Sequence, residues 1–204
     1  MLKGTNLSCE RQRRLLFDRI SFELAAGEVL RIEGPNGSGK TTMLRMLCGL
    51  YVDFEGEIEW ELDHYPLYIG HRTGVKDQLT AEENLGWLAR LYGSRDTDGV
   101  NREPDPADIR HALQEVGLRG FEDIRCDSLS EGQRKRVNMA RLYLIRSAAW
   151  ILDEPFSAID TGGVEKLQRR IEWQCEQGGA VVLTSHQPLE LDCPVKHITL
   201  GVEA

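Results

Sequence analysis

Long hydrophobic runs are missing from this sequence. No apolar stretch approaches the roughly 18 residues that a membrane-spanning helix requires. We also expect no signal peptide or lipoprotein leader, because the residues before Cys9 are too few and too polar to form one. The sequence therefore predicts a chain that does not cross a membrane alone, so that any membrane pathway must come from another chain.

Paired cysteines are missing as well. The five cysteines include no CxxC pair and no CxxCH haem-attachment motif, and their odd number prevents complete pairing. We therefore expect reduced thiols, as in cytosolic proteins. A bridge or a metal site made by Cys175 and Cys193 is the less favoured alternative.

Positively charged side chains are fewer than negatively charged ones. The chain carries 25 lysines and arginines against 33 aspartates and glutamates, for a net charge of −8. An acidic chain is a poor partner for a bare phosphate backbone. The composition thus argues against nucleic acid as a partner.

What is present is an alternation of strand-like and helix-like segments. Strands are predicted at 20–24, 29–33, 57–61, 66–70, 150–152 and 180–184, and helices at 42–50, 80–91, 108–116 and 132–146. The polar stretch at 95–108 reads as a surface loop. This order predicts an α/β fold with a parallel sheet. We expect one domain over residues 1–204, with the strand-poor stretch at about 74–147 as a helical insertion.

A glycine-rich segment follows the predicted strand at 29–33 and fits the phosphate-binding pattern GxxxxGK[ST]. Glycines let such a loop turn its backbone N–H groups inward toward an anion, and the following helix adds its positive dipole. We expect Lys40 to reach the β- and γ-phosphates of a nucleotide, and the Thr41 hydroxyl to bind Mg²⁺. The residues expected to bind nucleotide here are Gly34, Pro35, Asn36, Gly37, Ser38, Gly39, Lys40, Thr41 and Thr42.

Two carboxylates follow the apolar strand at 150–152. Asp153 is expected to hold Mg²⁺ at the strand tip, as the second acidic element of P-loop proteins does. Glu154 can orient and deprotonate an attacking water. Taken alone, this pair would be a solvated strand end, and only the phosphate loop makes the catalytic interpretation the better one.

Two further segments fit the same site. His186 follows the apolar strand at 180–184, and because parallel strand ends meet at one sheet edge, a γ-phosphate contact is plausible beside the alternative of a solvated histidine. The segment Leu129 to Gln133 precedes a helix. It can cap that helix through Ser130, and a helix N-terminus with Ser and Gly is also a phosphate receptor.

With these motifs in order, the sequence resembles the ABC ATPase family, a P-loop NTPase fold with a parallel-sheet core, a small antiparallel β subdomain and a helical insertion. The LSGGQ signature matches Leu129 to Gln133, with Glu131 in place of the first glycine. The Walker B strand and catalytic Glu match Trp150 to Glu154, the D-loop matches Ser157 to Asp160, and the switch His matches His186.

The resemblance implies a mechanism. Two copies of the chain would pair head to tail, each ATP being held by Lys40 and its loop on one side. Ser130, Gly132 and Gln133 of the second copy would hold it on the other. Hydrolysis with Glu154 as the base would reopen the dimer and drive a membrane partner.

Two positions depart from the family pattern. His71 stands where the family has a Gln that contacts Mg²⁺ and water, and a histidine can hydrogen-bond there although it is bulkier and titratable. Arg11 stands where an aromatic residue usually stacks on adenine. A guanidinium can also stack on a base, and a solvated arginine is the equally supported alternative.

A narrower resemblance is to the ATP-binding subunits of the Ccm cytochrome c maturation system, in which His71 is a family trait. It is carried by Gly70 to Lys76, Leu79 to Leu85, Gly120 to Ile124, Trp150 to Phe156 and Ser185 to Leu189. It implies an ATPase that energises haem export or the release of a haem-loaded chaperone. Such a subunit would dock peripherally on integral membrane Ccm-type subunits, at the cytoplasmic face of the bacterial inner membrane.

Three alternatives are weaker. One is an ABC ATPase of a different small-molecule transporter. Another is a soluble ABC ATPase acting on nucleic acid or ribosomes, which the missing coiled coil and the acidic charge oppose. The third is a nucleotide-binding regulator that hardly hydrolyses ATP, motivated by His71 and Arg11 and opposed by Glu154 and His186.

Overall fold

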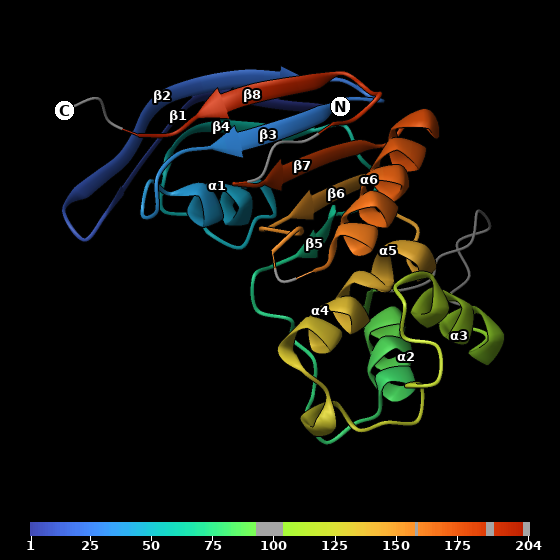
Figure 1. The fold of residues 1–204 in the computed structure, drawn as a ribbon. Coiled ribbons are helices and arrows are strands. Elements are labelled where there is room, and N and C mark those ends of the chain that lie inside the picture. The colour runs from blue at the N-terminus through green and yellow to red at the C-terminus, as the bar shows by residue number, and fades with distance from the viewer. Residues whose placement is uncertain (93–103, 158, 187–189, 202–204) are drawn as a thin grey trace. The chain divides into compact units, whose positions relative to one another are not determined.

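The backbone divides into two compact units, each described by itself below (Figure 1). The computed structural model describes residues 1–92, 104–157, 159–186 and 190–201. The first unit contains Met1–His71, Ser147–Ser157 and Gln168–Ala204, and the second contains Arg72–Arg146 and Ala158–Leu167. Within the described ranges, no helix has both the length and the apolar character needed to span a bilayer.

A five-stranded parallel sheet forms the centre of the first unit. Its strands, in spatial order, are β5 (Leu67–Ile69), β6 (Ala149–Leu152), β7 (Ala180–Thr184), β3 (Val29–Glu33) and β8 (Val195–Thr199). All residues of β6 and β7 are buried, as expected for parallel strands covered on both faces. The strands run in one direction, so their carboxyl ends meet at one edge, where ligands bind in such sheets.

A second, antiparallel sheet of the first unit has the order β2-β1-β4. It is built from β1 (Leu2–Arg11), β2 (Arg14–Leu24) and β4 (Glu55–Trp60). Helix α1 (Lys40–Leu47) contributes to one hydrophobic core with both sheets, through side chains such as Leu44, Phe17 and Ile32. The long helix α6 (Thr161–Glu176) belongs to both units, and Gln174 ties its last turn to the Ser147 carbonyl at 2.8 Å.

The second unit is helical. It contains α2 (Ala81–Tyr92), α3 (Pro106–Glu115), the short 3-10 helix η1 (Cys126–Ser128), α4 (Glu131–Met139) and α5 (Arg141–Leu144). These helices share a core of small and aliphatic residues that includes Leu85, Leu113 and Val137. A capping box begins α2, since Thr80 and Glu83 exchange side-chain and backbone hydrogen bonds at 2.8 and 3.1 Å.

A buried asparagine fixes the chain ahead of α2. Asn84 is fully buried, and its Oδ1 accepts from the Lys76 N–H at 2.7 Å. Its Nδ2 donates to the carbonyls of Lys76 and Thr80 at 2.9 and 3.0 Å. One side chain thus satisfies backbone groups on both sides of the turn, which would otherwise be buried without partners.

The structure confirms the predicted fold class, and the predicted strands at 29–33 and 180–184 match β3 and β7 residue for residue. The single helix predicted at 132–146 is wrong: the chain tightens at Ala140, where Tyr143 donates to the Ala140 carbonyl, and the second piece ends at Leu144. Most of the surface loop predicted at 95–108 lies outside the described residues, and α3 begins earlier than expected, at Pro106 after the cap Asp105.

Besides the short η1, three elements were not predicted at all. Strand β1 lacks the regular alternation of apolar and polar residues that predicts a strand. Its pairing shifts register between Gly4 and Leu7 and again before Cys9, so that Leu7, Ser8 and Cys9 are all buried. Strand β8 is an edge strand with exposed Lys196 and His197 and thus little apolar signal. Helix α6 was not predicted because two consecutive glycines in its first turn lower the helix propensity of the sequence there.

Asn84 offers a test of how the second unit is held together. We expect Asn84→Ala to lower the free energy of unfolding by about 3 kcal/mol, because several buried backbone groups lose their partner. Urea denaturation would measure this. The matched control Gln114→Ala, at an exposed position of α3, should stay within about 0.5 kcal/mol of the parent. Equal losses in both variants would contradict the role of Asn84.

Candidate functional site

The glycine-rich loop at the carboxyl end of β3 has a backbone that other residues cannot follow. Gly34 has φ 141°, and a Cβ atom there would overlap the carbonyl oxygen of Leu200. Gly39, the residue before α1, has φ 100° and lies close to Leu16 and Phe17. Both positions therefore require glycine, and the loop they form ends on the open N–H groups of α1.

Lys40 closes this loop on itself. Its Nζ donates to the carbonyls of Gly34 and Pro35 at 2.7 and 3.2 Å. Both partners are uncharged carbonyls, and a phosphate would be a stronger acceptor for the Lys40 ammonium. The loop lines a cleft of about 480 Å³. The members of the predicted phosphate loop that line it are Asn36, Gly37, Gly39, Lys40, Thr41 and Thr42.

Pro35 and Ser38 face a different hollow. It measures about 160 Å³ and is lined by both residues together with Arg14 and Gly201. The Ser38 hydroxyl is buried, and it has no hydrogen-bond partner within the described part of the chain. Ser38 thus contributes to the phosphate loop through its backbone, whose N–H donates to the Pro35 carbonyl at 3.2 Å.

The carboxylate of Asp153 is fixed by two hydroxyl groups. Asp153 follows β6 and is 3% exposed. Its Oδ2 accepts from the Thr41 hydroxyl of α1 at 2.9 Å, and its Oδ1 accepts from the Thr184 hydroxyl of β7 at 3.0 Å. Three chain segments distant in sequence therefore converge on one carboxylate. Hydroxyl and carboxylate oxygens are the ligands that Mg²⁺ prefers, so Thr41 and Asp153 fit that ion.

Glu154 adopts a backbone conformation that is rare for a glutamate. Its φ is 51°, and its N–H donates to the Thr184 hydroxyl at 2.8 Å. The turn is also held by Ser157, whose hydroxyl donates to the Glu154 carbonyl at 3.1 Å. Such strain persists where the surroundings enforce it, and it gathers at functional sites. Here it aims the Glu154 side chain at the cleft.

The histidine after β7 reaches this glutamate. His186 Nε2 lies 3.3 Å from Glu154 Oε1, and the His186 side chain is 56% exposed whereas that of Glu154 is 19% exposed. The pair therefore joins the carboxyl ends of β6 and β7. Both residues line the same cleft as Lys40.

The two departures from the family pattern also lie at this cleft. His71, which follows β5, and Arg11, the last residue of β1, are among its lining residues. Arg11 pairs with Arg14 across a tight hairpin whose two turn residues, Gln12 and Arg13, have φ values of 53° and 62°. The cleft thus brings the cations Arg11 and Lys40 and the two histidines His71 and His186 together with the carboxylates of Asp153 and Glu154.

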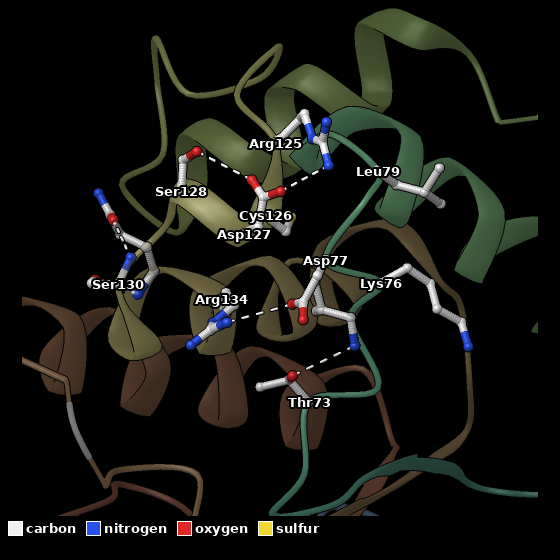
Figure 2. Close-up of polar contacts among 12 residues, drawn as sticks. Thr73, Lys76, Asp77, Leu79, Arg125, Cys126, Asp127, Ser128, Ser130 and Arg134 are labelled. Atoms are coloured by element: carbon white, nitrogen blue, oxygen red, sulfur yellow. Dashed lines mark hydrogen bonds and ion pairs between the residues drawn. The ribbon is translucent and has the colours of Figure 1, made fainter.

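The signature segment lies in the second unit, at the start of α4 (Figure 2). Ser130 is the N-cap: its Oγ accepts from the Gln133 N–H at 3.2 Å, and Gln133 Oε1 accepts from the Ser130 N–H at 2.9 Å. This capping box confirms the predicted cap. It leaves the Ser130 hydroxyl proton and the Gly132 N–H as donors at the helix start.

Arginines of α4 tie the signature helix to its surroundings within the second unit. Arg134 lies 3.4 Å from Asp77, as Figure 2 shows, and Arg136 lies 2.6 Å from Asp160. The Gly163 N–H, together with Arg136, lowers the pKa of the Asp160 carboxyl. The contacts of Asp160 stabilise the fold at neutral pH, and their contribution is lost as the pH falls through the lowered pKa of this carboxyl. Ala158, in the middle of the predicted D-loop, lies outside the described residues.

Sequence reasoning missed Thr184, although it is central to the site. Its hydroxyl holds both Asp153 and the Glu154 backbone. A signal was available, because a hydroxyl at the end of an otherwise apolar buried strand needs a partner. All five cysteines are free thiols in the structure, and the side chains of Cys175 and Cys193 lie within hydrogen-bond distance of each other.

Thr184 can be tested by an isosteric change. Thr184→Val removes a donor to Asp153 and an acceptor for the Glu154 N–H while keeping the shape, so we expect the free energy of unfolding to fall by about 1–3 kcal/mol. Chemical denaturation measures this. Thr199→Val, at an exposed position of edge strand β8, is the control, with an expected change within about 0.5 kcal/mol. A Thr184→Val variant as stable as this control would speak against the network.

Known proteins share both the sequence and the fold. The family model described as ABC transporter matches residues 17–157. The cytochrome c biogenesis ATP-binding export protein CcmA of Pseudomonas putida is 49% identical over 199 residues, covering 93% of this chain and 90% of that protein. CcmA of Escherichia coli K12 is 45% identical over 211 residues, covering 98% and 96%.

Solved structures agree with this assignment. An ABC transporter ATP-binding protein from Pyrococcus furiosus superimposes with a TM-score of 0.79 at 26% identity, covering 98% of this chain and 96% of that one. A dimeric ATP-binding cassette with ADP and Pi superimposes with a TM-score of 0.76 at 22% identity, covering 92% and 88%. Together with the motifs at the cleft, these likenesses establish that the chain belongs to the ABC transporter family of ATP-binding proteins, within the group of cytochrome c biogenesis proteins named CcmA.

Proposed function

We propose that this chain hydrolyses ATP as a subunit of a membrane complex in c-type cytochrome biogenesis, and that hydrolysis energises haem export or the release of a haem-loaded chaperone. The observation that carries the ATPase activity is the cleft in which Lys40, Asp153, Glu154 and His186 face one another. The cytochrome assignment is supported by the relatives, whose name describes an ATP-binding export protein of cytochrome c biogenesis.

ATP would bind with its phosphates in the loop from Gly34 to Thr42. The open N–H groups at the start of α1 and the Lys40 ammonium provide donors and positive charge for the β- and γ-phosphates. Mg²⁺ would be held by Thr41 and Asp153, and it would neutralise phosphate charge. Arg11 lines the cleft and would stack on the base through its guanidinium plane.

Hydrolysis would use Glu154 as the general base. A water oxygen attacks the γ-phosphorus, its proton passes to the Glu154 carboxylate, and the bond between the γ-phosphorus and the β–γ bridging oxygen breaks to release ADP and phosphate. His186, at 3.3 Å from Glu154, would orient that carboxylate and contact the γ-phosphate. His71 lines the same cleft and would hydrogen-bond to the water or the phosphate in place of the family's Gln.

The site would be completed by a second copy of the chain. Its Ser130 can keep accepting from the Gln133 N–H and still donate its hydroxyl proton, because a hydroxyl has one donor and two acceptor sites. The Gly132 N–H, in the first turn of α4, adds a backbone donor. Gln133 contributes by fixing the cap.

In this proposal the whole chain, residues 1–204, works as one ABC ATPase domain, with residues 74–147 as its helical insertion. The second compact unit, which includes Arg72–Arg146, supports that division. The domain would dock peripherally on integral membrane subunits of the Ccm type, at the cytoplasmic face of the inner membrane. The net charge of −8 gives no support to nucleic acid as the partner.

The base is tested by Glu154→Gln, which keeps the shape of the side chain and removes its basicity. We expect ATP turnover by the complex with its membrane partners to fall by about 10²- to 10⁴-fold while ATP binding persists. Phosphate release and nucleotide titration measure the two effects. Glu59→Gln, at an exposed position of β4, is the control and should retain full turnover. If the Glu154→Gln variant turns over ATP as fast as the parent, the proposed role of Glu154 as the general base is wrong.

The cytochrome assignment has its own test, because an ABC ATPase of another small-molecule transporter would have the same cleft. We expect haem-handling membrane proteins to copurify with the full chain in detergent. We also expect cells that carry only Glu154→Gln to lack covalently bound haem in their c-type cytochromes. Copurification with an unrelated permease, together with normal cytochromes in those cells, would favour the other transporter.

A further inference from the structure

A charged side chain lies on the most buried sheet of the protein. Strand β3 lies between β7 and β8, as Figure 1 shows, and its residues Val29, Leu30 and Ile32 are at most 1% exposed. Arg31 interrupts this apolar run, and its side chain is only 13% exposed. Arginine at such a position must find partners, since an unpaired buried charge is costly.

Arg31 has two such partners, on its own strand and on the next one. Its Nε lies 2.8 Å from Glu33 Oε1, two residues along β3 on the same face, in an ion pair whose geometry is not that of a hydrogen bond. Its Nη2 donates to the carbonyl oxygen of Ser185 at 3.4 Å. The guanidinium therefore joins the residue just before Gly34 to the backbone just after β7.

Ser185 stands between the two residues that reach the catalytic carboxylates from β7. Thr184 donates to Asp153 and accepts from the Glu154 N–H, and His186 lies 3.3 Å from Glu154. Past Thr184 the ladder with β3 ends, because Ile32 with Thr184 is the last registered pair. The Arg31 guanidinium thus reaches the Ser185 carbonyl one residue beyond the last registered pair of β3 with β7.

The ion pair by itself contributes little to stability. The side chains of Arg31 and Glu33 are 13% and 33% exposed, so the cost of removing them from water offsets part of their attraction. An arginine in this place does provide what an apolar residue cannot, namely a donor directed at the Ser185 carbonyl.

We propose that Arg31 is a positioning residue for hydrolysis: it holds the Ser185 carbonyl, and so sets the direction in which His186 leaves β7, while Glu33 anchors the guanidinium. The inference rests on the proposed ATPase function and adds a residue to it. Arg31 lines neither the cleft nor the smaller hollow, so it acts through His186 and does not touch ATP.

The test is a split between turnover and binding. Arg31→Met keeps the length and apolar bulk of the side chain and removes the donor, so we expect kcat for ATP hydrolysis by the membrane complex to fall about fivefold, with KM for ATP within about twofold of the parent. Arg31→Lys retains one charged donor without the fork, and its kcat should lie between those of Arg31→Met and the parent.

Two further variants make the result decisive. Lys3→Met, in an exposed ion pair of the antiparallel sheet, is the control and should keep kcat and KM. Should Arg31→Met fail to fold, Glu33→Gln tests the same link, because the guanidinium loses its charged anchor and kcat should again fall at constant KM.

The outcomes separate this inference from the proposed function. Parent-like kcat in Arg31→Met, or in Glu33→Gln where Arg31→Met does not fold, overturns the role of Arg31. So does a rise in KM that accounts for the whole loss, or an Arg31→Lys variant no better than Arg31→Met. Turnover that survives Glu154→Gln overturns the ATPase mechanism itself, whatever the Arg31 variants do.

Discussion

The site depends on one carboxylate held from two sides. Asp153 accepts the hydroxyl of Thr41, on the helix after the glycine-rich loop, and the hydroxyl of Thr184, at the end of the neighbouring strand. Because Asp153 is almost fully buried, each of these bonds forms in a medium of low dielectric, where satisfied polar groups are strong and orphaned ones are costly. The loop, the strand ends and the strained turn at Glu154 therefore adopt their positions together.

The sequence was most informative where local chemistry decides the structure. The glycine-rich loop, Asp153 and Glu154 could be placed from short motifs, since each needs particular residue types at fixed spacing. The structure brings Lys40, Asp153, Glu154, His186, His71 and Arg11 to one cleft. Thr184 and Arg31 were not predicted as site residues, because their partners lie on neighbouring strands that are distant in sequence. The identity of a residue within a strand does not indicate which strand will lie beside it.

Irregular pairing limited the rest of the prediction. In strand β1 the pairing shifts register where alternation of apolar and polar residues would have been sought, and three consecutive residues are buried. The helix expected at 132–146 contains a tightened turn at Ala140 that no glycine or proline marks. By contrast, the cap at Ser130 could be predicted, because a capping residue stands at a fixed place before the helix it begins.

The close approach of Gly34 to Leu200 has a consequence for how the protein folds during its synthesis. Strand β3 emerges early in synthesis, yet both of its neighbours, β7 and β8, belong to the far end of the sequence. Leu200 also donates its N–H to the Glu33 carbonyl at 2.8 Å, so the backbone that shapes Gly34 is made long after Gly34 itself. In a nascent chain the phosphate-binding motif therefore leaves the ribosome before the strands that flank β3, and the loop can take its final shape only after those distant segments have paired.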